Sequence, residues 1–540
     1  MIFSSVYIKP PRHFVIPVSH YRFYSAHHIP IHSDTDQLQI NQFINTNEFN
    51  YIKRYQLRNN RLNRPVVGIA VSGGGYRSLT VCSALLSQLE QYNYIPYINY
   101  ISGTSGATWY MSQLYTHHLT CQPCSINTQS SNYYQHIHNI LRSKLTTHHM
   151  ISINTLNYRQ LIKNIIYAYA TMKSLSVIDL LSYAIDATFL HSTNNNHSID
   201  LFTSHHQSLH NNVLPYPIYN MIDGINQLFY CMTPDEFQCI DLQCSIPINS
   251  VHHRYTNGTP DVTQAEHEQL IKLCTVLAIC GSAFCVDINR ILSELKYHVP
   301  STYLNLLHYM IQNRSMLTSQ LIASYKINNI LYNLSNEQQS QINHINHDKL
   351  IELCQQPQIT LSDAGTLCNV PFHSLLRRHC NIIICIDNST PPDIYDAYSI
   401  KQMYVYGKQY NIKLPELSDS NIQYIKPCNT SYKSLLGGTI PNIDHHFTHV
   451  KLQLIQQMSY SLCTIIHGNK PSNIPTILYI PLIKNDKFNS DYDPRQLCIQ
   501  RQHLHTFNLH YTVDQFNQLS ELVQWNLNEI IDEIRHVLDS

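Results

Sequence analysis

Glycine is scarce in this chain: only 14 of its 540 residues are glycine. Six of these fall in two short segments, at Gly68, Gly73, Gly74, Gly75, Gly103 and Gly106. Glycine is required where the backbone takes a positive φ or comes very close to another group. Because the chain uses so little glycine elsewhere, this clustering indicates two tight turns with special backbone geometry.

The chain also lacks net charge and long apolar runs. Lys plus Arg and Asp plus Glu number 35 each, so the overall charge gives no reason to expect a nucleic-acid partner. No stretch of about 18 or more apolar residues occurs, so no membrane-spanning helix is expected. The 16 cysteines are spread evenly and do not form the dense framework of a disulfide-stapled secreted domain. The first residues do not resemble a signal peptide. These absences favour a cytoplasmic protein.

Residues 1–60 are predicted to form an N-terminal leader without clear periodicity, and residues 61–540 to form one main domain. Five basic residues lie together near this boundary, with no acidic residue among them: Lys53, Arg54, Arg58, Arg61 and Arg64. A charge run of this kind is usually a solvated face. The alternative is a contact with an anionic lipid surface.

Short apolar runs predict the strands of an α/β fold. Residues 66–71 and 381–387 are continuous apolar runs rich in β-branched residues, a pattern typical of strands buried on both faces of a parallel sheet. Further strands are expected at 97–101, 358–365 and 474–483. Parallel strands require helical connections, so the sequence predicts a central, mostly parallel sheet flanked by helices.

Helices are expected after each glycine turn and at the end of the chain. Apolar residues recur at helical spacing after Arg77 and again after Ser105. The last helix is preceded by a capping-box pattern at Thr512 and Gln515. Residues from about 120 to 340 mix helical segments with Asn- and His-rich loops and contain no linker. They are predicted to be a helical and loop-rich cap or lid inserted into the main domain.

Ser105 stands at the corner between a predicted strand and a predicted helix, with Gly103 and Gly106 close on either side. This arrangement is similar to a nucleophile elbow, although Ala107 breaks the strict G-x-S-x-G pattern. Two predicted strands end at Asp363 and Asp387. Ligands of open α/β sheets bind beyond the carboxyl ends of strands, so both aspartates are candidates for the pocket that holds Ser105. Asp387 lies in the weaker motif, and a structural role is favoured for it.

Two other kinds of site fit parts of the sequence. A Ser-Asp-His triad would place its histidine downstream of Asp363, where His445 and His446 occur. Neither histidine lies in a distinctive motif, so the triad is the less favoured arrangement. The run His117-His118-x-x-Cys121-x-x-Cys124 has metal-like spacing, but such runs arise readily in a chain rich in histidine and cysteine, and no metal site is predicted.

Three short motifs follow one another along the chain. Residues 72–79 read Ser-Gly-Gly-Gly-Tyr-Arg-Ser-Leu, residues 103–115 read Gly-Thr-Ser-Gly-Ala-Thr-Trp-Tyr-Met-Ser-Gln-Leu-Tyr, and Asp363-Ala-Gly365 is followed by Asn369-Val-Pro371. They resemble, in order, SGGGxRAM, GLSGSTWYMSxLY, and DSG or DGG followed by NxP. These are motifs of the catalytic domain of cytosolic (group IV) phospholipase A2 and its fungal phospholipase B relatives, which are patatin-like acyl hydrolases. With weaker similarity near 281–284 and from 506 onward, the resemblance covers most of residues 60–540.

The resemblance implies a serine acyl hydrolase that works without a metal or another cofactor. By it, Ser105 is the nucleophile and Asp363 the base of a Ser-Asp dyad. The N–H groups of Gly74 and Gly75 would form the oxyanion hole, and Arg77 would hold the phosphate of the substrate. The implied activity is hydrolysis of fatty-acyl esters of glycerophospholipids or lysophospholipids through an acyl-serine intermediate.

Two alternatives remain beside this activity. The acyl group could pass to an acceptor other than water, which would make the protein a lipid transacylase. The departures from the family motifs at Ser78 and Ala107 also leave open an inactive lipid-binding protein. Animal members of the family often carry a C2 domain ahead of the catalytic domain, and the residues before position 61 are too few for one. The basic residues from Lys53 to Arg64 are therefore the predicted site of peripheral contact with a phospholipid membrane.

Overall fold

The computed structural model describes residues 22–23, 44–120, 132–147, 177–190, 205–209, 213–285, 325–427 and 443–539, apart from short gaps at 63, 210–212, 252–254, 257–258, 261–270, 341, 343–346, 392 and 507. Much of the predicted cap between about 120 and 340 falls outside these ranges. The cap therefore stays a prediction.

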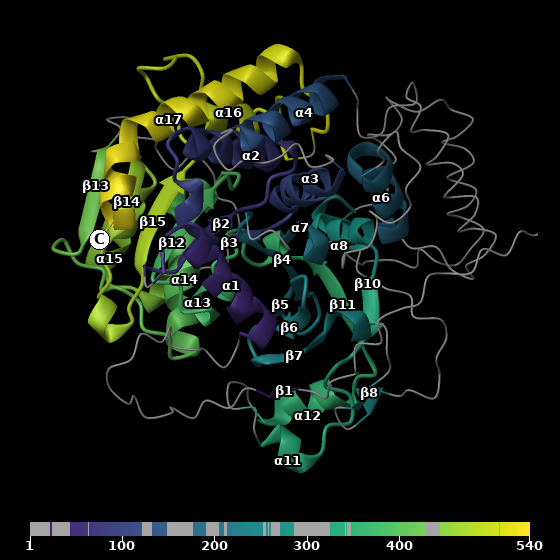
Figure 1. The fold of residues 1–540 in the computed structure, drawn as a ribbon. Coiled ribbons are helices and arrows are strands. Elements are labelled where there is room, and N and C mark those ends of the chain that lie inside the picture. Colours follow the sequence, from purple (N-terminus) through teal and green to yellow (C-terminus); the bar gives the residue numbers. More distant parts are fainter. Residues whose placement is uncertain are drawn as a thin grey trace, which may run out of the picture.

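One large mixed sheet organises the described part of the chain (Figure 1). Its 13 strands follow the order β1-β7-β6-β5-β4-β3-β2-β12-β15-β14-β13, with β11 on β4 and β10 on β11. The strands of this sheet are β1 (Arg22–Phe23), β2 (Val67–Val71), β3 (Ile98–Gly103), β4 (Tyr216–Asp223), β5 (Leu228–Met232), β6 (Glu236–Cys239), β7 (Cys244–Pro247), β10 (Tyr325–Asn328), β11 (Gln358–Asp363), β12 (Ile382–Asp387), β13 (Ile422–Pro427), β14 (Ser461–Ile466) and β15 (Thr476–Pro481). A separate small hairpin pairs β8 (Tyr255–Thr256) with β9 (Thr259–Pro260).

The centre of the sheet is parallel, as the apolar runs predict. Strand β2 pairs in parallel with β3 and β12, β12 with β15, and β3 with β4. Every residue of β2, β3, β4 and β12 is buried. The remaining pairs are antiparallel and extend the sheet at both ends. The predicted fold class, α/β with helices on a central sheet, is confirmed, but only the centre of the sheet is parallel and the sheet as a whole is mixed, not mostly parallel as predicted.

Helices cover both faces of the sheet. They are α1 (Thr46–Arg58), α2 (Tyr76–Gln91), α3 (Gly106–Thr120), α4 (Tyr133–Thr147), α6 (Val177–Ile185), α7 (His205–Leu209), α8 (Leu273–Cys280), α11 (Asn336–Gln339), α12 (His347–Gln355), α13 (His373–Arg377), α14 (Tyr398–Gln409), α15 (His449–Met458), α16 (Pro494–Ile499) and α17 (Val513–Asp539). Neighbouring residues in the strand register contact helices on opposite faces. Ile384 of β12 faces Leu85 of α2 and Leu527 of α17. One residue earlier in register, Gly68 of β2 lies against Leu375 of α13 on the opposite face.

The last helix matches its sequence pattern. Gln515 N–H donates to Thr512 Oγ1 at 3.2 Å, and Thr512 N–H donates to Gln515 Oε1 at 2.9 Å, which is a reciprocal capping box. The apolar stripe from Phe516 to Val537 is buried. In Figure 1, α17 lies along one side of the sheet beside α2 and α4. The amphipathic pattern therefore predicted both the helix and the face that it buries.

Two segments differ from the sequence-based interpretation. Residues 46–58, within the region read as lacking periodicity, form α1, which buries Tyr51, Ile52 and Tyr55 under the sheet. Residues 216–247, within the region read as a cap, form strands β4 to β7 of the main sheet. Buried polar residues interrupt the apolar pattern of both segments, among them Glu48 and Gln56 in α1 and Asn220 and Asp223 in β4.

Candidate active site

Ser105 occupies a strained turn between β3 and α3. Its φ is 52°, a left-handed conformation that residues other than glycine adopt rarely. Gly106 follows because a Cβ at that position would lie 2.0 Å from the carbonyl oxygen of Gly75. At the next position a methyl group is accommodated, and Ala107 is fully buried. The departure from G-x-S-x-G therefore leaves the elbow geometry intact, with the glycine at the position of closest approach.

Asp363 and Ser105 come together because the strands before them, β11 and β3, both pair with β4 and run in opposite directions. Strand β3 runs parallel to the first half of β4 and ends with Gly103 opposite Tyr219. Strand β11 runs antiparallel to the second half of β4 and ends with Asp363 opposite Met221. The carboxyl ends of β3 and β11 thus meet on one edge of β4. The sequence argument expected the two residues to come together at the ends of parallel strands, whereas β11 is antiparallel.

The carboxyl group of Asp363 is buried and accepts several hydrogen bonds. Gly365 N–H donates to Oδ1 at 2.8 Å, Ala283 N–H donates to Oδ2 at 3.4 Å, and the Ser105 hydroxyl is also bonded to the carboxyl group. Burial raises the pKa of Asp363 to about 7, and the three hydrogen bonds oppose this rise only partly. A carboxylate with a pKa near neutrality is suited to accept a proton from a hydroxyl group.

The glycine turn after β2 lies directly against this pair. A Cβ at Gly73 would lie 2.8 Å from the Cβ of Ser105. Gly74 and Gly75 both have positive φ, 143° and 58°, and Gly75 is the N-cap of α2. N–H groups at the start of a helix favour negative charge. The structure thus brings the two predicted oxyanion-hole residues next to the predicted nucleophile.

Asn369 connects the glycine turn to the aspartate turn, a role that the sequence analysis did not assign. Its Oδ1 accepts from Gly73 N–H at 2.9 Å, and its Nδ2 donates to Gly73 O at 3.3 Å and to Ser389 Oγ at 2.8 Å. The same Oδ1 lies 3.0 Å from where a Cβ of Gly365 would be. The motif that follows Asp363-Ala-Gly365 contains this asparagine, so the sequence marked the residue but did not show that it contacts the glycine turn.

Arg77 is not at the surface of the site. Its side chain is 1% exposed, and its guanidinium donates to Asn388 O from Nε at 3.0 Å and from Nη2 at 2.7 Å. It also bonds to Leu504 O, to Cys498 Sγ at 3.2 Å and to Thr506 Oγ1 at 3.4 Å. The predicted phosphate ligand is thus surrounded by protein acceptors in this structure.

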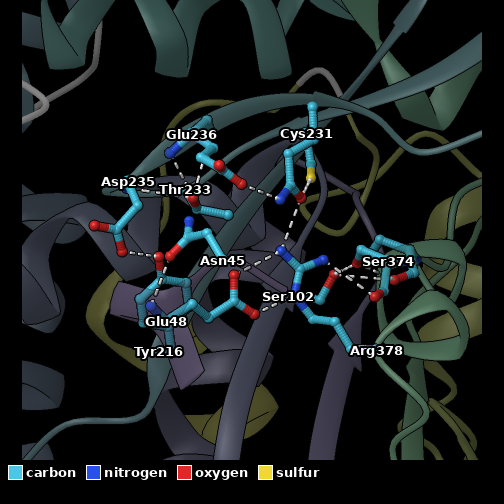
Figure 2. Close-up of polar contacts among 12 residues, drawn as sticks. Asn45, Glu48, Ser102, Tyr216, Cys231, Thr233, Asp235, Glu236, Ser374 and Arg378 are labelled. Atoms are coloured by element: carbon cyan, nitrogen blue, oxygen red, sulfur yellow. Dashed lines mark hydrogen bonds and ion pairs between the residues drawn. The ribbon is translucent and has the colours of Figure 1, made fainter. Parts of the chain in front are cut away.

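A buried polar network supports β3, the strand that leads to Ser105 (Figure 2). Ser102 Oγ bonds to Ser374 Oγ and to Pro371 O, each at 2.9 Å. Below it, the guanidinium of Arg378 forms a bidentate pair with Glu48 of α1, with distances of 2.6 and 3.1 Å. Both side chains of this pair are fully buried. The network joins β3, α13 and α1 beneath the elbow.

The other predicted candidates lie apart from the Ser105–Asp363 contact or outside the described residues. Asp387 accepts from Ser389 N–H, Ser399 Oγ and Tyr479 Oη at 2.8 to 2.9 Å, which is a structural environment. His445 and His446 are exposed in a short 3-10 helix. Among the described residues, no group of three or more His, Cys, Asp or Glu side chains is arranged to hold a metal ion. The side chains of Cys121 and Cys124 fall outside those residues.

Comparison with known families gives a match along most of the chain. The family model described as the lysophospholipase catalytic domain matches residues 67–481, from the first residue of β2 to the last residue of β15. The chain belongs to the lysophospholipase catalytic domain family. This match includes the elbow, the glycine turn and the turn at Asp363.

Individual relatives cover less of the chain. Mouse cytosolic phospholipase A2 gamma is 24% identical over 237 residues, which are 42% of this chain and 35% of the mouse protein. The human protein of the same name is 40% identical over 52 residues, 10% of each chain. The aligned part of this chain therefore spans about a third of the mouse protein and a tenth of the human protein.

Solved structures share the fold. The structure of human GIVD cytosolic phospholipase A2 has a TM-score of 0.64 at 15% identity and covers 92% of this chain and 64% of its own. The same human protein in complex with methyl gamma-linolenyl fluorophosphonate gives a TM-score of 0.58. The predicted resemblance to group IV phospholipase A2 is thus confirmed at the level of family and fold. In the described part of the chain, no helix combines the length and apolar character needed to cross a bilayer.

Proposed function

We propose that this chain hydrolyses fatty-acyl ester bonds of glycerophospholipids or lysophospholipids through an acyl-Ser105 intermediate. The observation that supports this most is the contact between the Ser105 hydroxyl and a buried carboxyl group whose pKa is about 7. A serine hydroxyl is a weak nucleophile until a positioned base takes its proton. Family membership adds that such a site occurs in a lipid-hydrolysing domain.

In the first half of the proposed reaction, Ser105 Oγ attacks the ester carbonyl carbon while its proton passes to Asp363. The oxygen of the carbonyl becomes negatively charged next to the N–H groups of Gly74 and Gly75, which stabilise it. The C–O bond to the lipid then breaks, and the leaving alkoxide takes the proton from Asp363. In the second half, water attacks the acyl-serine, gives a proton to Asp363 and releases the fatty acid, and Ser105 regains its proton.

Fatty-acid release from phospholipid and lysophospholipid vesicles tests this proposal. Ser105→Ala and Asp363→Asn are each expected to lower kcat by at least about 1,000-fold, because removing one member of a nucleophile–base pair disables the pair. Ser112→Ala is the matched control, since this buried serine lies farther along α3 and donates to Trp109 O. Equal release by all four proteins would contradict the proposal.

Two measurements separate the alternatives. An alkyl fluorophosphonate should label wild type at Ser105 and leave Ser105→Ala unlabelled, whereas an inactive lipid-binding protein would not be labelled. Adding a lysolipid or an alcohol as acceptor and analysing the products distinguishes a transacylase from a hydrolase. Formation of acylated acceptor in place of free fatty acid would replace hydrolysis as the main reaction.

We further propose that the exposed side of α1 contacts the membrane surface. Leu57 is 60% exposed between the basic residues Arg54 and Arg58, and Lys53 is also exposed. An apolar side chain within a basic patch suits the interface of an anionic bilayer. This proposal gives the protein a peripheral membrane association.

Charge neutralisation tests the membrane contact. Changing Lys53, Arg54 and Arg58 to Gln should weaken binding to phosphatidylserine vesicles on the order of 100-fold, at about 1 kcal/mol per charge near the surface. The matched control changes three exposed lysines elsewhere, Lys408, Lys413 and Lys487. Equal binding by the two triple variants in a vesicle-sedimentation assay would dismiss α1 as the contact.

A further inference from the structure

The guanidinium of Arg77 has no donor left for a ligand. It carries five N–H groups, and the structure gives five contacts: two to Asn388 O, and one each to Leu504 O, Cys498 Sγ and Thr506 Oγ1. A phosphate could bind only by displacing one of these acceptors, and three of the five contacts are to backbone carbonyl oxygens that would then lose a hydrogen bond. Leaving such groups unpaired in the protein interior costs free energy.

The same guanidinium supports the glycine turn from behind. A Cβ at Gly74 would lie 2.6 Å from Nη2 and 3.1 Å from Cζ of Arg77, so Gly74 packs directly against the guanidinium group with no space for a side chain. Asn369 also bonds to both backbone polar groups of Gly73, accepting from its N–H and donating to its C=O. Three consecutive glycines have no side chains to fix their conformation, and their orientation depends on these two neighbours.

We propose that Arg77 is a positioning residue of the oxyanion loop, acting with Asn369, and that it does not contact the phosphate of the substrate. The inference rests on the proposed function and deepens it. Arg77 ties the loop to the end of β12 through Asn388 and to the C-terminal segment through Cys498, Leu504 and Thr506. The N–H groups of Gly74 and Gly75 are thereby held toward Ser105 before the substrate arrives.

Two reactions that differ in their need for a phosphate contact test this role. One is the hydrolysis of 1-oleoyl lysophosphatidylcholine, which has a phosphate head group. The other is labelling of Ser105 by an alkyl fluorophosphonate that has no lipid head group. Arg77→Lys should slow both reactions by a similar factor, on the order of 10–100-fold, with little change in KM for the lysophospholipid. Arg495→Lys is the matched control, because this buried arginine also donates to carbonyl oxygens, those of Leu482 and Ser459.

A phosphate contact would give a different result. Arg77→Lys would then impair only the lysophospholipid reaction, mainly through KM, and labelling would keep its wild-type rate. That outcome would overturn the positioning role. A wild-type protein that is labelled at Ser105 but does not cleave the lysophospholipid would refute the proposed substrate while the labelling rates still test Arg77. Absence of labelling in wild type would overturn both proposals.

A remote variant keeps the inference testable should Arg77→Lys fail to fold. Cys498→Ala removes one partner of Arg77 from α16 and leaves Arg77 itself in place. If Arg77 braces the loop, this variant should slow the labelling of Ser105 and lysophospholipid hydrolysis together, and thermal unfolding should show that it is folded. A wild-type labelling rate in folded Cys498→Ala would contradict the positioning role of Arg77.

Discussion

At the scale of single residues, the site depends on a carboxyl group kept away from water. Asp363 is 1% exposed and Ser105 is 5% exposed. Burial disfavours the charged form of a carboxyl group, while the N–H groups of Gly365 and Ala283 favour it. The balance places the pKa near neutrality, so the base strength of Asp363 is set by its surroundings more than by its residue type.

The first residue-scale prediction concerns the rate. Because Asp363 must be unprotonated to accept the proton of Ser105, kcat/KM should rise with pH through about 7 and level off above it. Measuring kcat/KM for lysophospholipid hydrolysis over a series of pH values tests this rise. A rate that is already at its plateau at pH 5 would contradict the raised pKa, and a rise that persists in Asp363→Asn would assign it to another group.

The second concerns stability. The folded-state pKa of Asp363 lies above the ordinary value of 3.8, so the folded state binds the proton more tightly than the unfolded state. This contribution to stability is present below about pH 4 and is lost as pH rises through 7. Asp363→Asn should therefore raise Tm relative to wild type more at pH 8 than at pH 5. Thermal unfolding at the two pH values checks it, and an equal difference at both would show that Asp363 is already charged in the folded state at pH 5, which contradicts the raised pKa.

Sequence reasoning found some of these residues and not others, for a physical reason. Ser105 lies between glycines that a tight turn needs, and Asp363 ends a predicted strand at a turn, so both have local signals. The residues that hold these two side chains and the glycine turn in place have no such local signal. Ser282 Oγ accepts from Asp363 N–H at 2.9 Å, and the partners of Arg77 lie more than 300 residues along the chain. Contacts of that kind follow from the folded packing and cannot be read from spacing.

At the scale of elements, the glycine turn after β2 and the start of α3 fit together without space for a side chain. The backbone of Gly75 lies where a Cβ of Gly106 would be. The glycine turn and the turn at Ser105 are therefore one packed unit, and a change in either should alter the other.

Gly106→Ala tests this unit. The added methyl would meet the Gly75 carbonyl at 2.0 Å, a distance at which the backbone of one segment must shift. We expect activity to fall on the order of 100-fold or more, comparable to the loss of an oxyanion donor. Gly224→Ala is the control, since its new Cβ would meet only Ser362 Oγ at 3.2 Å. Similar activities for the two variants, measured as initial rates of fatty-acid release, would show that the loop does not depend on this contact.

The sequence predicted the elements of the parallel centre better than those of the flanks. Strands β2, β3, β12 and β15 fall within two residues of their predicted ranges, because strands buried on both faces are almost continuously apolar. Strand β4 was not predicted. Its residues include Asn220 and Asp223, both buried and hydrogen-bonded, so its polarity resembles that of a loop. A strand can bury such residues only where the fold supplies partners, which its own sequence does not reveal.

At the scale of the whole molecule, the pair Glu48–Arg378 attaches α1 to the layer beneath the sheet. Both side chains are fully buried, and Arg378 also bonds to Gln238 at 2.8 Å. Through Ser374 and Ser102, the same network reaches the strand that carries the elbow. The N-terminal helix is therefore part of the support of the site.

Glu48→Gln should lower the free energy of unfolding by about 3–5 kcal/mol, because it leaves the buried charge of Arg378 without its counter-ion. Chemical denaturation measures this change. The control is Glu529→Gln, which removes an exposed pair with Lys426 and should cost about 1 kcal/mol or less. Equal losses in the two variants would show that α1 is not anchored by the buried pair.

The meeting of β3 and β11 on one edge of β4 has a consequence for how this molecule could diverge. Gly103, two residues before Ser105, pairs with Tyr219, and Asp363 pairs with Met221, so β4 sets the spacing between the proposed nucleophile and the proposed base. Segments between β3 and β4, or between β4 and β11, could change in length without altering that spacing. A slip of one residue between β11 and β4, by contrast, would move Asp363 about 3.4 Å and turn its side chain to the other face. The separation of Ser105 and Asp363 thus depends on β4 and on its register with β3 and β11.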